Sequence, residues 1–447
     1  MSTADGEEPQ GSVATAQGTT ADHEQTAKAD EAALVAAPEV VANSLGEYLA
    51  AWGRRLRNGE SGMVPVLFGL IAIVIAFQLE NSKFLSNGNL VNLFVEAALY
   101  VMFGAAEFFV LILSEIDLSA GFTAAVCGFV IAELMSSPVS LPWWLAVIGG
   151  LVVGLMIGGL QGLLVTRLGL PSFVVTLGGF LAFQGVMLEL ATIDKTAVGG
   201  VVSVSSDSPV YKLVNANMST TLGWIVLIVA LGLFAAVTLI SVTRRRAKGL
   251  TAPPISVALL TIGIAAVVGV ALVLICNANR GAFVIAVRGV PWVIPFVLLV
   301  LLIYSMLMAK TRLGRYMYAI GNNPEAARRA GIRVSLVRTT GFMLCSMTAA
   351  LAGLIYMSQL GSISTDFDGG TYVLFAVAAA VIGGTSLFGG RGKPVHSLLG
   401  GVLIAVVYNG LELLSVSTAI QDIATAGVLI AAVSVDALVR RRSSTLR

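Results

Sequence analysis

The chain has 447 residues, of which 57% are hydrophobic and only 12% are charged, and its formal net charge is +2. A soluble globular domain carries about 25% charged residues, so this composition excludes an ordinary soluble protein. Apolar runs of about 20 residues recur along most of the chain, and the short alternating segments of a membrane β-barrel are absent. We therefore expect a bundle of helices in a lipid bilayer, with no nucleic-acid partner.

The two ends of the chain differ in composition from the rest. Residues 1–43 are rich in Ala, Thr, Glu and Gly, which predicts a disordered cytoplasmic tail, and they lack the pattern of a signal peptide. Residues 44–62 are predicted to form an amphipathic juxtamembrane segment, with Tyr48 and Trp52 on one face. Residues 440–447 form a basic tail, also expected in the cytoplasm.

Residues 63–439 are predicted to form an all-α transmembrane domain with about twelve membrane-spanning helices. The expected spans are 63–79, 90–113, 119–135, 142–166, 171–192, 222–243, 255–277, 291–309, 336–358, 372–389, 395–415 and 420–439. With a cytoplasmic N-terminus, 22 of the 27 Lys and Arg residues fall in cytoplasmic segments. The positive-inside rule therefore predicts that both termini are cytoplasmic and that residues 193–221 lie outside.

Within the cytoplasmic loop 310–335, the sequence predicts a short helix that is capped at both ends. Asn323 is a good N-cap, Pro324 suits the first helical position, and Gly331 can adopt a left-handed cap. The helix either docks a partner protein or is a basic loop held by lipid headgroups. The residues expected to couple it to a partner are Asn323, Pro324, Glu325, Ala326, Ala327, Arg328, Arg329 and Gly331.

Three stretches carry a resemblance to a known family. They are YAIGNNPEAARRAGI around the short helix, EIDLSAG at 115–121, and VIGGTSLFGGRG at 381–392, followed by NGL at 409–411. In this order they resemble the motifs of sugar-type ABC importer permeases of the ribose and xylose family. Asn322 and Glu115 stand where the family has Gly, and an added apolar span lies within 244–279.

The resemblance implies the ABC importer permease fold and a homodimer in the bacterial inner membrane. It also implies three partners: a cytoplasmic ABC ATPase subunit, an extracytoplasmic sugar-binding protein and a small-molecule sugar. The family resemblance and the extra length favour a pentose, in particular D-xylose. In such a system the short helix at Asn323–Gly331 would contact the ATPase.

The chain carries no nucleotide-binding loop of its own. Gly392-Lys393 is followed by Pro394, where a phosphate-binding loop needs Ser or Thr. No metal-protease, nucleophile-elbow or clustered metal-ligand motif occurs either. We therefore expect no catalytic residues, no metal and no cofactor, and an ATPase activity that resides in a separate subunit.

Polar residues within the spans are the candidates for a translocation path. Carboxylates and amides exchange hydrogen bonds with the hydroxyl groups of a sugar, and they are costly in hydrocarbon unless they face a partner or water. The expected path residues are Glu96, Glu107, Asn409 and Glu412. The alternative is that they join helices through interhelical hydrogen bonds. Asp117 is expected to cap the next helix, and the Gly-rich stretch 386–394 to break a helix.

Two other functions fit a chain with this many spans. An ion-coupled secondary sugar transporter should carry paired ionisable residues inside the membrane, and a passive channel should carry a selectivity ring. No selectivity ring can be identified, and the strongest amphipathic feature is the short cytoplasmic helix. The sequence therefore favours the ABC importer permease, with the secondary transporter as the alternative.

Overall fold

A computed structural model describes residues 46, 47, 50, 53, 64–137, 139–193, 198–249, 252–281, 286–427, 430 and 434. The predictions for the tails at 1–43 and 440–447, and for most of 44–62, lie outside these residues. The described elements are α3 (Val64–Glu80), α4 (Asn87–Leu111), α5 (Ala120–Met135), α6 (Trp143–Arg167), α7 (Ser172–Leu190), η1 (Val198–Gly200), β1 (Val201–Ser203), α8 (Pro209–Asn215), α9 (Thr220–Ala247), α10 (Ile255–Asn277), α11 (Val293–Lys310), α12 (Arg312–Asn322), α13 (Pro324–Arg329), α14 (Val334–Leu360), β2 (Ser362–Ser364), α15 (Gly369–Ile382) and α16 (His396–Leu413).

The chain divides into two compact units, which are described separately. One comprises Met1–Arg55 and Leu231–Ala266, and the other comprises Leu56–Ala230 and Val267–Arg447. In the first unit the described residues are mainly the adjoining parts of α9 and α10, and the turn between these helices is closed by a hydrogen bond from Arg246 Nη2 to the Pro253 carbonyl (3.0 Å). All the sites described below lie in the second unit.

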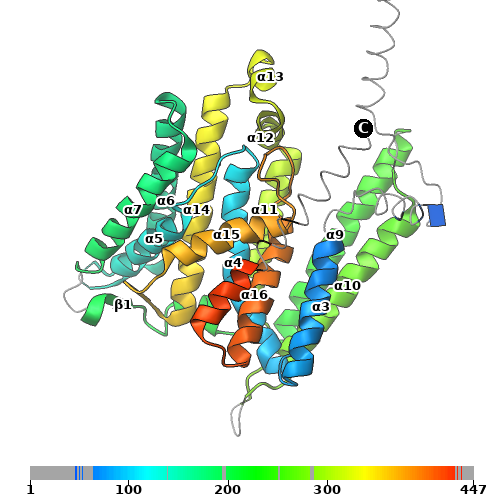
Figure 1. Ribbon diagram of the computed structural model, residues 1–447. Coiled ribbons are helices and arrows are strands. Elements are labelled where there is room, and N and C mark those ends of the chain that lie inside the picture. The colour runs from blue at the N-terminus through cyan, green and yellow to red at the C-terminus, as the bar shows by residue number, and fades with distance from the viewer. Residues whose placement is uncertain are drawn as a thin grey trace, which may run out of the picture. The chain divides into compact units, whose positions relative to one another are not determined.

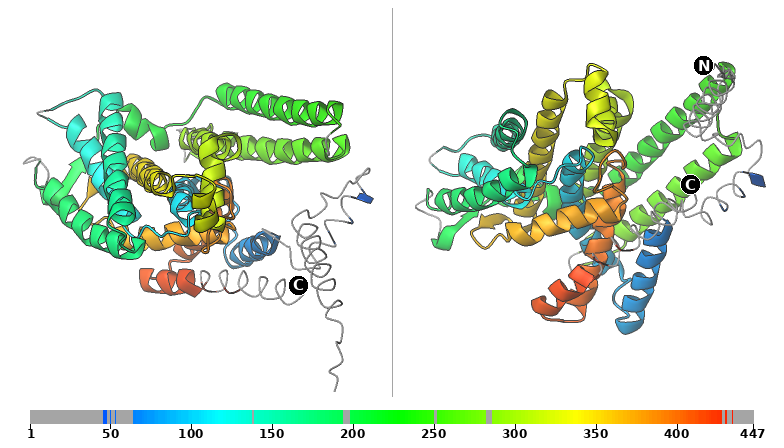
Figure 2. Two further views of the ribbon diagram at one scale, coloured as in Figure 1. Left: turned by 90° about the horizontal axis from the view of Figure 1, so that it is seen from above. Right: turned by 45° about the horizontal axis from the view of Figure 1, so that its top comes forward.

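Helix α4 forms the centre of the second unit. It is apolar on every side, and each of its residues from Ala97 to Leu111 is buried, as expected for a helix enclosed by others. Helices α14, α15 and α16 pack against it (Figure 1). Helix α7 packs on α5 and α6 (Figure 2).

Glycines allow α6 and α14 to approach closely. A Cβ at Gly158 would collide with the Phe342 carbonyl oxygen, and a Cβ at Gly162 would lie 2.6 Å from the Cα of Thr339. Small residues at such contacts are typical of helix association in lipid, where close van der Waals packing replaces the hydrophobic driving force.

The all-α membrane fold expected from the sequence is confirmed, but the number of spans is not. Among the described residues, 8 helices are long and apolar enough to cross a membrane, and shorter apolar helices occupy Val66–Glu80, Ala120–Met135 and Gly369–Ile382. The last predicted span, 420–439, lies largely outside the described residues. The span predicted at 372–389 ends early, because α15 stops at Ile382 and Gly384, Gly389, Gly390 and Gly392 all have positive φ angles.

Helix α14 connects the two ends of the second unit. It has 27 residues and is therefore about 40 Å long, enough to cross a bilayer. Helices α12 and α13 lie beside its first residues (Figure 1). At its last residues, strand β2 pairs antiparallel with β1, with Val202 opposite Ile363.

Candidate functional site

Helix α13 forms as the sequence predicts. The Asn323 side chain accepts a hydrogen bond from the Ala326 N–H (2.9 Å), Pro324 occupies the first turn, and Gly331 has a φ of 81°. Glu325 and Arg328 form an exposed ion pair at 2.8 Å on its surface. The helix is thus a rigid, capped element that ends in a left-handed glycine.

The face of α13 that is free for a partner is narrower than expected. Ala327 is only 4% exposed and packs into the core of its own chain, while Ala326, Arg329 and Ala330 are exposed. The Ala327 carbonyl accepts the Ile332 N–H (3.1 Å), which turns the chain back toward α14. Ala327 therefore anchors the helix and cannot enter a partner's cleft, because it faces inward.

The residues just before α13 are joined to the Gly-rich loop 383–395. The Tyr318 hydroxyl donates to the Gly392 carbonyl (2.7 Å), and its partial burial raises the pKa of this phenol. A Cβ at Gly321 would collide with the carbonyl oxygen of Ile112 and would lie 2.5 Å from the backbone nitrogen of Gly390. Gly390 itself donates to Ile112 (3.0 Å). Three segments that are distant in sequence therefore meet backbone to backbone at this end.

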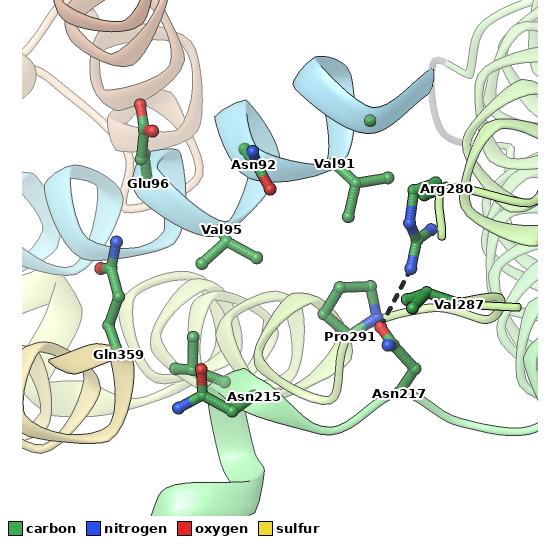
Figure 3. A pocket seen from close by; sticks show the side chains of 12 residues that line it. Val91, Asn92, Val95, Glu96, Asn215, Asn217, Arg280, Val287, Pro291 and Gln359 are labelled. Carbon is green, nitrogen blue, oxygen red and sulfur yellow. Dashed lines mark hydrogen bonds between the residues drawn. The ribbon is translucent and has the colours of Figure 1, made fainter. Parts of the chain in front are cut away.

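The other end of α14 borders two polar pockets. The larger has a volume of about 530 Å³ and the smaller about 300 Å³, and Glu96 and Gln359 line both. These volumes lie in the range of about 300–1,000 Å³ that is usual for small-molecule sites. Glu96 comes from α4 and Gln359 from the last turn of α14 (Figure 3).

The smaller pocket combines aromatic rings with carboxylates. Four tyrosines, Tyr100, Tyr356, Tyr372 and Tyr408, line it together with Glu96 and Glu412. Phenol rings offer flat apolar faces and polar hydroxyl groups, while the carboxylates accept hydrogen bonds. This combination suits a ligand that has both C–H surfaces and hydroxyl groups.

The larger pocket is lined by amides and charged residues together with valines. Asn92, Asn215, Asn217 and Gln359 surround it, and Arg280 lies at the end away from Glu96 (Figure 3). Amides both donate and accept hydrogen bonds, so this wall can bind hydroxyl groups in either sense.

Asn409 supports the carboxylate that the pockets share. It is 4% exposed, donates from Nδ2 to Glu96 Oε1 (3.3 Å) and accepts on Oδ1 from Asn89 Nδ2 (2.8 Å). It therefore lies behind Glu96 and joins α16 to α4. Of the four predicted path residues, Glu96 and Glu412 line the pockets and Asn409 positions one of them.

Glu107, the fourth predicted path residue, lies elsewhere. It is fully buried and lines neither pocket, and among the described residues its carboxylate oxygens have no hydrogen-bond partner. Asp117 lies just before α5, and its Oδ1 accepts from the N–H (2.9 Å) and hydroxyl (2.6 Å) of Ser119, the residue that precedes the first helical residue Ala120.

Sequence reasoning did not find Arg280 or three of the four tyrosines, which are Tyr100, Tyr356 and Tyr372. Aromatic residues in apolar spans resemble ordinary core residues, and the four tyrosines come from four different helices, α4, α14, α15 and α16. Arg280 was counted only as one of the few cations expected outside. The sequence feature that could have indicated a role for Arg280 is its position immediately after the added apolar span.

This arrangement defines a multi-pass membrane permease, with a polar pocket at one end of a spanning helix and a capped basic helix at the other. The family model described as "Branched-chain amino acid transport system / permease component" matches residues 89–433. The chain belongs to this family, in the branch of sugar-type ABC importer permeases, and it is a multi-pass inner-membrane permease subunit and not an enzyme.

Curated relatives cover most of the chain. The D-allose transport system permease protein of Escherichia coli strain K12 is 30% identical over 84% of this chain and 91% of its own. The xylose transport system permease protein of the same organism is 32% identical over 86% of this chain and 96% of its own. Its ribose import permease protein is 28% identical over 83% and 92%. No solved structure matches this chain.

Proposed function

We propose that this chain carries a monosaccharide, of the pentose class and in particular D-xylose, through the pair of pockets that share Glu96 and Gln359. The observation that carries this proposal is the pocket lining, in which carboxylates, amides and tyrosines stand beside apolar side chains. The choice of D-xylose is supported by the alignment with the xylose permease, which spans 394 residues, against 376 for the D-allose permease and 370 for the ribose permease.

The path residues that we propose are Glu96 and Glu412, with Asn409 holding Glu96 in place. Glu107 is fully buried and lines neither pocket, so we leave it out of the path. We place the pocket end of α14 outside the cytoplasm, because Lys310, Arg312, Arg328 and Arg329 gather at its other end. With this orientation both termini are cytoplasmic, and a sugar-binding protein delivers its cargo to the pockets.

Helix α13 is proposed as the docking helix for a separate ATPase. It is rigid, exposed on one side, and connected through α14 to Tyr356 and Gln359 in the pockets. We propose further that two copies of the chain form the working unit, since the family resemblance implies a homodimer and Glu412 is exposed on a single chain.

The docking role is tested at Gly331, whose φ of 81° has open space around the position of a Cβ. Gly331→Val should uncouple ATP hydrolysis from transport, because a β-branched residue is strained at this φ. Gly331→Asn is the matched control and should retain coupling, since Asn tolerates the left-handed region. Normal coupling in Gly331→Val would leave α13 without a role in docking.

The transport role is tested in proteoliposomes that contain the permease with its ATPase and binding protein. ATP should drive uptake of D-xylose faster than uptake of D-ribose or D-allose. Preference for D-allose would contradict the pentose assignment. ATP-independent uptake driven by a proton or sodium gradient would contradict the importer mechanism as a whole.

A further inference from the structure

Arg280 is held in a fixed position at the end of the larger pocket. Its guanidinium donates to the carbonyl oxygens of Cys276 and Gly289 (3.1 Å for Gly289) and to Asn217 Oδ1 (3.2 Å), as Figure 3 shows for Asn217. The turn around it is equally constrained. Gly289 has a φ of 101°, and a Cβ there would collide with the Met218 carbonyl oxygen. The backbone around Arg280 therefore holds its guanidinium in one position.

The cation has no counter-ion among the described residues. No carboxylate there lies within ion-pair distance of Arg280, and the three acceptors use three of its five N–H groups. Partial burial lowers the pKa of Arg280, although a guanidinium stays charged at neutral pH. Two donors of a partly desolvated, uncompensated cation thus remain available beside the pocket.

The Glu96 carboxylate lines the opposite end of the same pocket. Glu96 Oε1 accepts from Asn409, while the buried Oε2 has no partner among the described residues. Amides from Asn92, Asn215 and Gln359 line the wall between the two charged ends. A ligand that spans the pocket must therefore accept hydrogen bonds at one end and donate them at the other.

We propose that this pocket is a sugar-entry subsite, in which Arg280 and Glu96 bind opposite ends of a neutral polyhydroxylated ligand and Arg280 determines selectivity. Hydroxyl groups both accept and donate, so they satisfy Arg280 and Glu96 together. One cation and one carboxylate line the pocket, so their charges balance and a neutral ligand leaves no further charge to compensate. This inference rests on the proposed transport function, and it assigns the first binding step of transport to this pocket.

The subsite also gives a role to the added apolar span. Cys276 and Asn277 end α10, and the Cys276 carbonyl accepts one hydrogen bond from Arg280 and another from the Gly289 N–H (2.9 Å). The end of this added helix therefore positions the cation. A chain without the span would lack this support for an arginine at the pocket.

The experiment measures protection of a cysteine placed in the pocket. Asn92 is exposed and lines the pocket, and the native cysteines Cys127, Cys276 and Cys345 are buried. The Asn92→Cys permease, assembled with its ATPase in proteoliposomes, is treated with a polar thiol reagent with and without D-xylose, D-ribose, D-allose or D-gluconate. The exposed Ser206→Cys variant, whose cysteine lies outside the pocket, is the matched control.

We expect the neutral sugar that the complex transports to slow labelling of Asn92→Cys and not of Ser206→Cys. Arg280→Gln should raise the protecting concentration at least about tenfold, as expected when hydrogen bonds to a charged group are lost. Arg280→Lys should give an intermediate protecting concentration, because lysine keeps the positive charge but lacks the planar set of N–H donors of a guanidinium. Arg288→Gln, an exposed arginine on the same segment, should change nothing.

Three results would overturn the subsite. They are no protection by the transported sugar, unchanged protection in Arg280→Gln with a normal melting temperature, or stronger protection by D-gluconate than by any neutral sugar. If Arg280→Gln fails to fold, the Arg280→Lys variant is used in its place. Full protection by the sugar in Arg280→Lys would then contradict the proposal. Absence of ATP-driven uptake of any monosaccharide by the wild-type complex would instead contradict the proposed function.

Discussion

Arg338 lies with its Nε 3.2 Å from Glu115 Oε1, so the first turns of α14 are joined to the segment between α4 and α5. The two side chains are 29% and 10% exposed. The ion pair gives Glu115, which lies between α4 and α5, a structural role. The ion pair connects the start of α14 to the segment after α4, whose residue Ile112 contacts Gly321 and Gly390.

The first prediction concerns this ion pair. Glu115→Gln and Arg338→Gln should each destabilise the purified permease by about 1–3 kcal/mol, because each leaves a largely buried charge without its partner. The double variant should cost less than the sum of the two, with a coupling of about 0.5–3 kcal/mol. Additive losses in a double-mutant cycle of detergent unfolding would show that the two charges do not interact.

The second prediction concerns the junction before α13. Gly321→Ala should destabilise the permease by roughly 1–3 kcal/mol and weaken binding of the ATPase, since the new methyl group collides with Ile112 and Gly390. Gly185→Ala in α7 is the control. It has open space around it and should change stability by less than about 0.5 kcal/mol. Equal melting temperatures for the two variants would contradict the tight junction.

The third prediction concerns orientation. Ser206 and Ser335 are exposed, lie near opposite ends of the second unit and can each be replaced by cysteine. In intact cells a membrane-impermeant thiol reagent should label Ser206→Cys and leave Ser335→Cys unlabelled until the cells are opened. Labelling of both from the same side would reverse or scramble the proposed topology.

The fourth prediction separates path lining from helix joining. Glu412→Ala removes an exposed carboxylate from the smaller pocket and should lower uptake at least about tenfold with normal assembly. Asn409→Ala removes both hydrogen bonds that join α16 to Asn89 and Glu96, so it should lower the melting temperature as well as uptake. The two are compared by size-exclusion profile, melting temperature and uptake. Poor assembly in Glu412→Ala would assign it to helix joining instead.

The sequence by itself determined the membrane class and the local structure of α13. Both depend on short-range chemistry: runs of apolar residues long enough for a bilayer, and caps such as Asn323 and Gly331 that act on their own backbone. The sequence also predicted that the Gly-rich stretch 386–394 breaks a helix, although the structure ends α15 earlier, at Ile382.

Only the tertiary structure decided which polar residues meet. Glu96 and Glu107 both lie in α4, eleven positions apart, yet one opens on two pockets and the other is enclosed. Helical spacing could not separate them, since α4 is surrounded on all sides. Arg280 gained its partners Asn217 and Gly289 from segments 63 and 9 residues away. Such contacts arise when distant segments pack together, and no local pattern in the sequence records them.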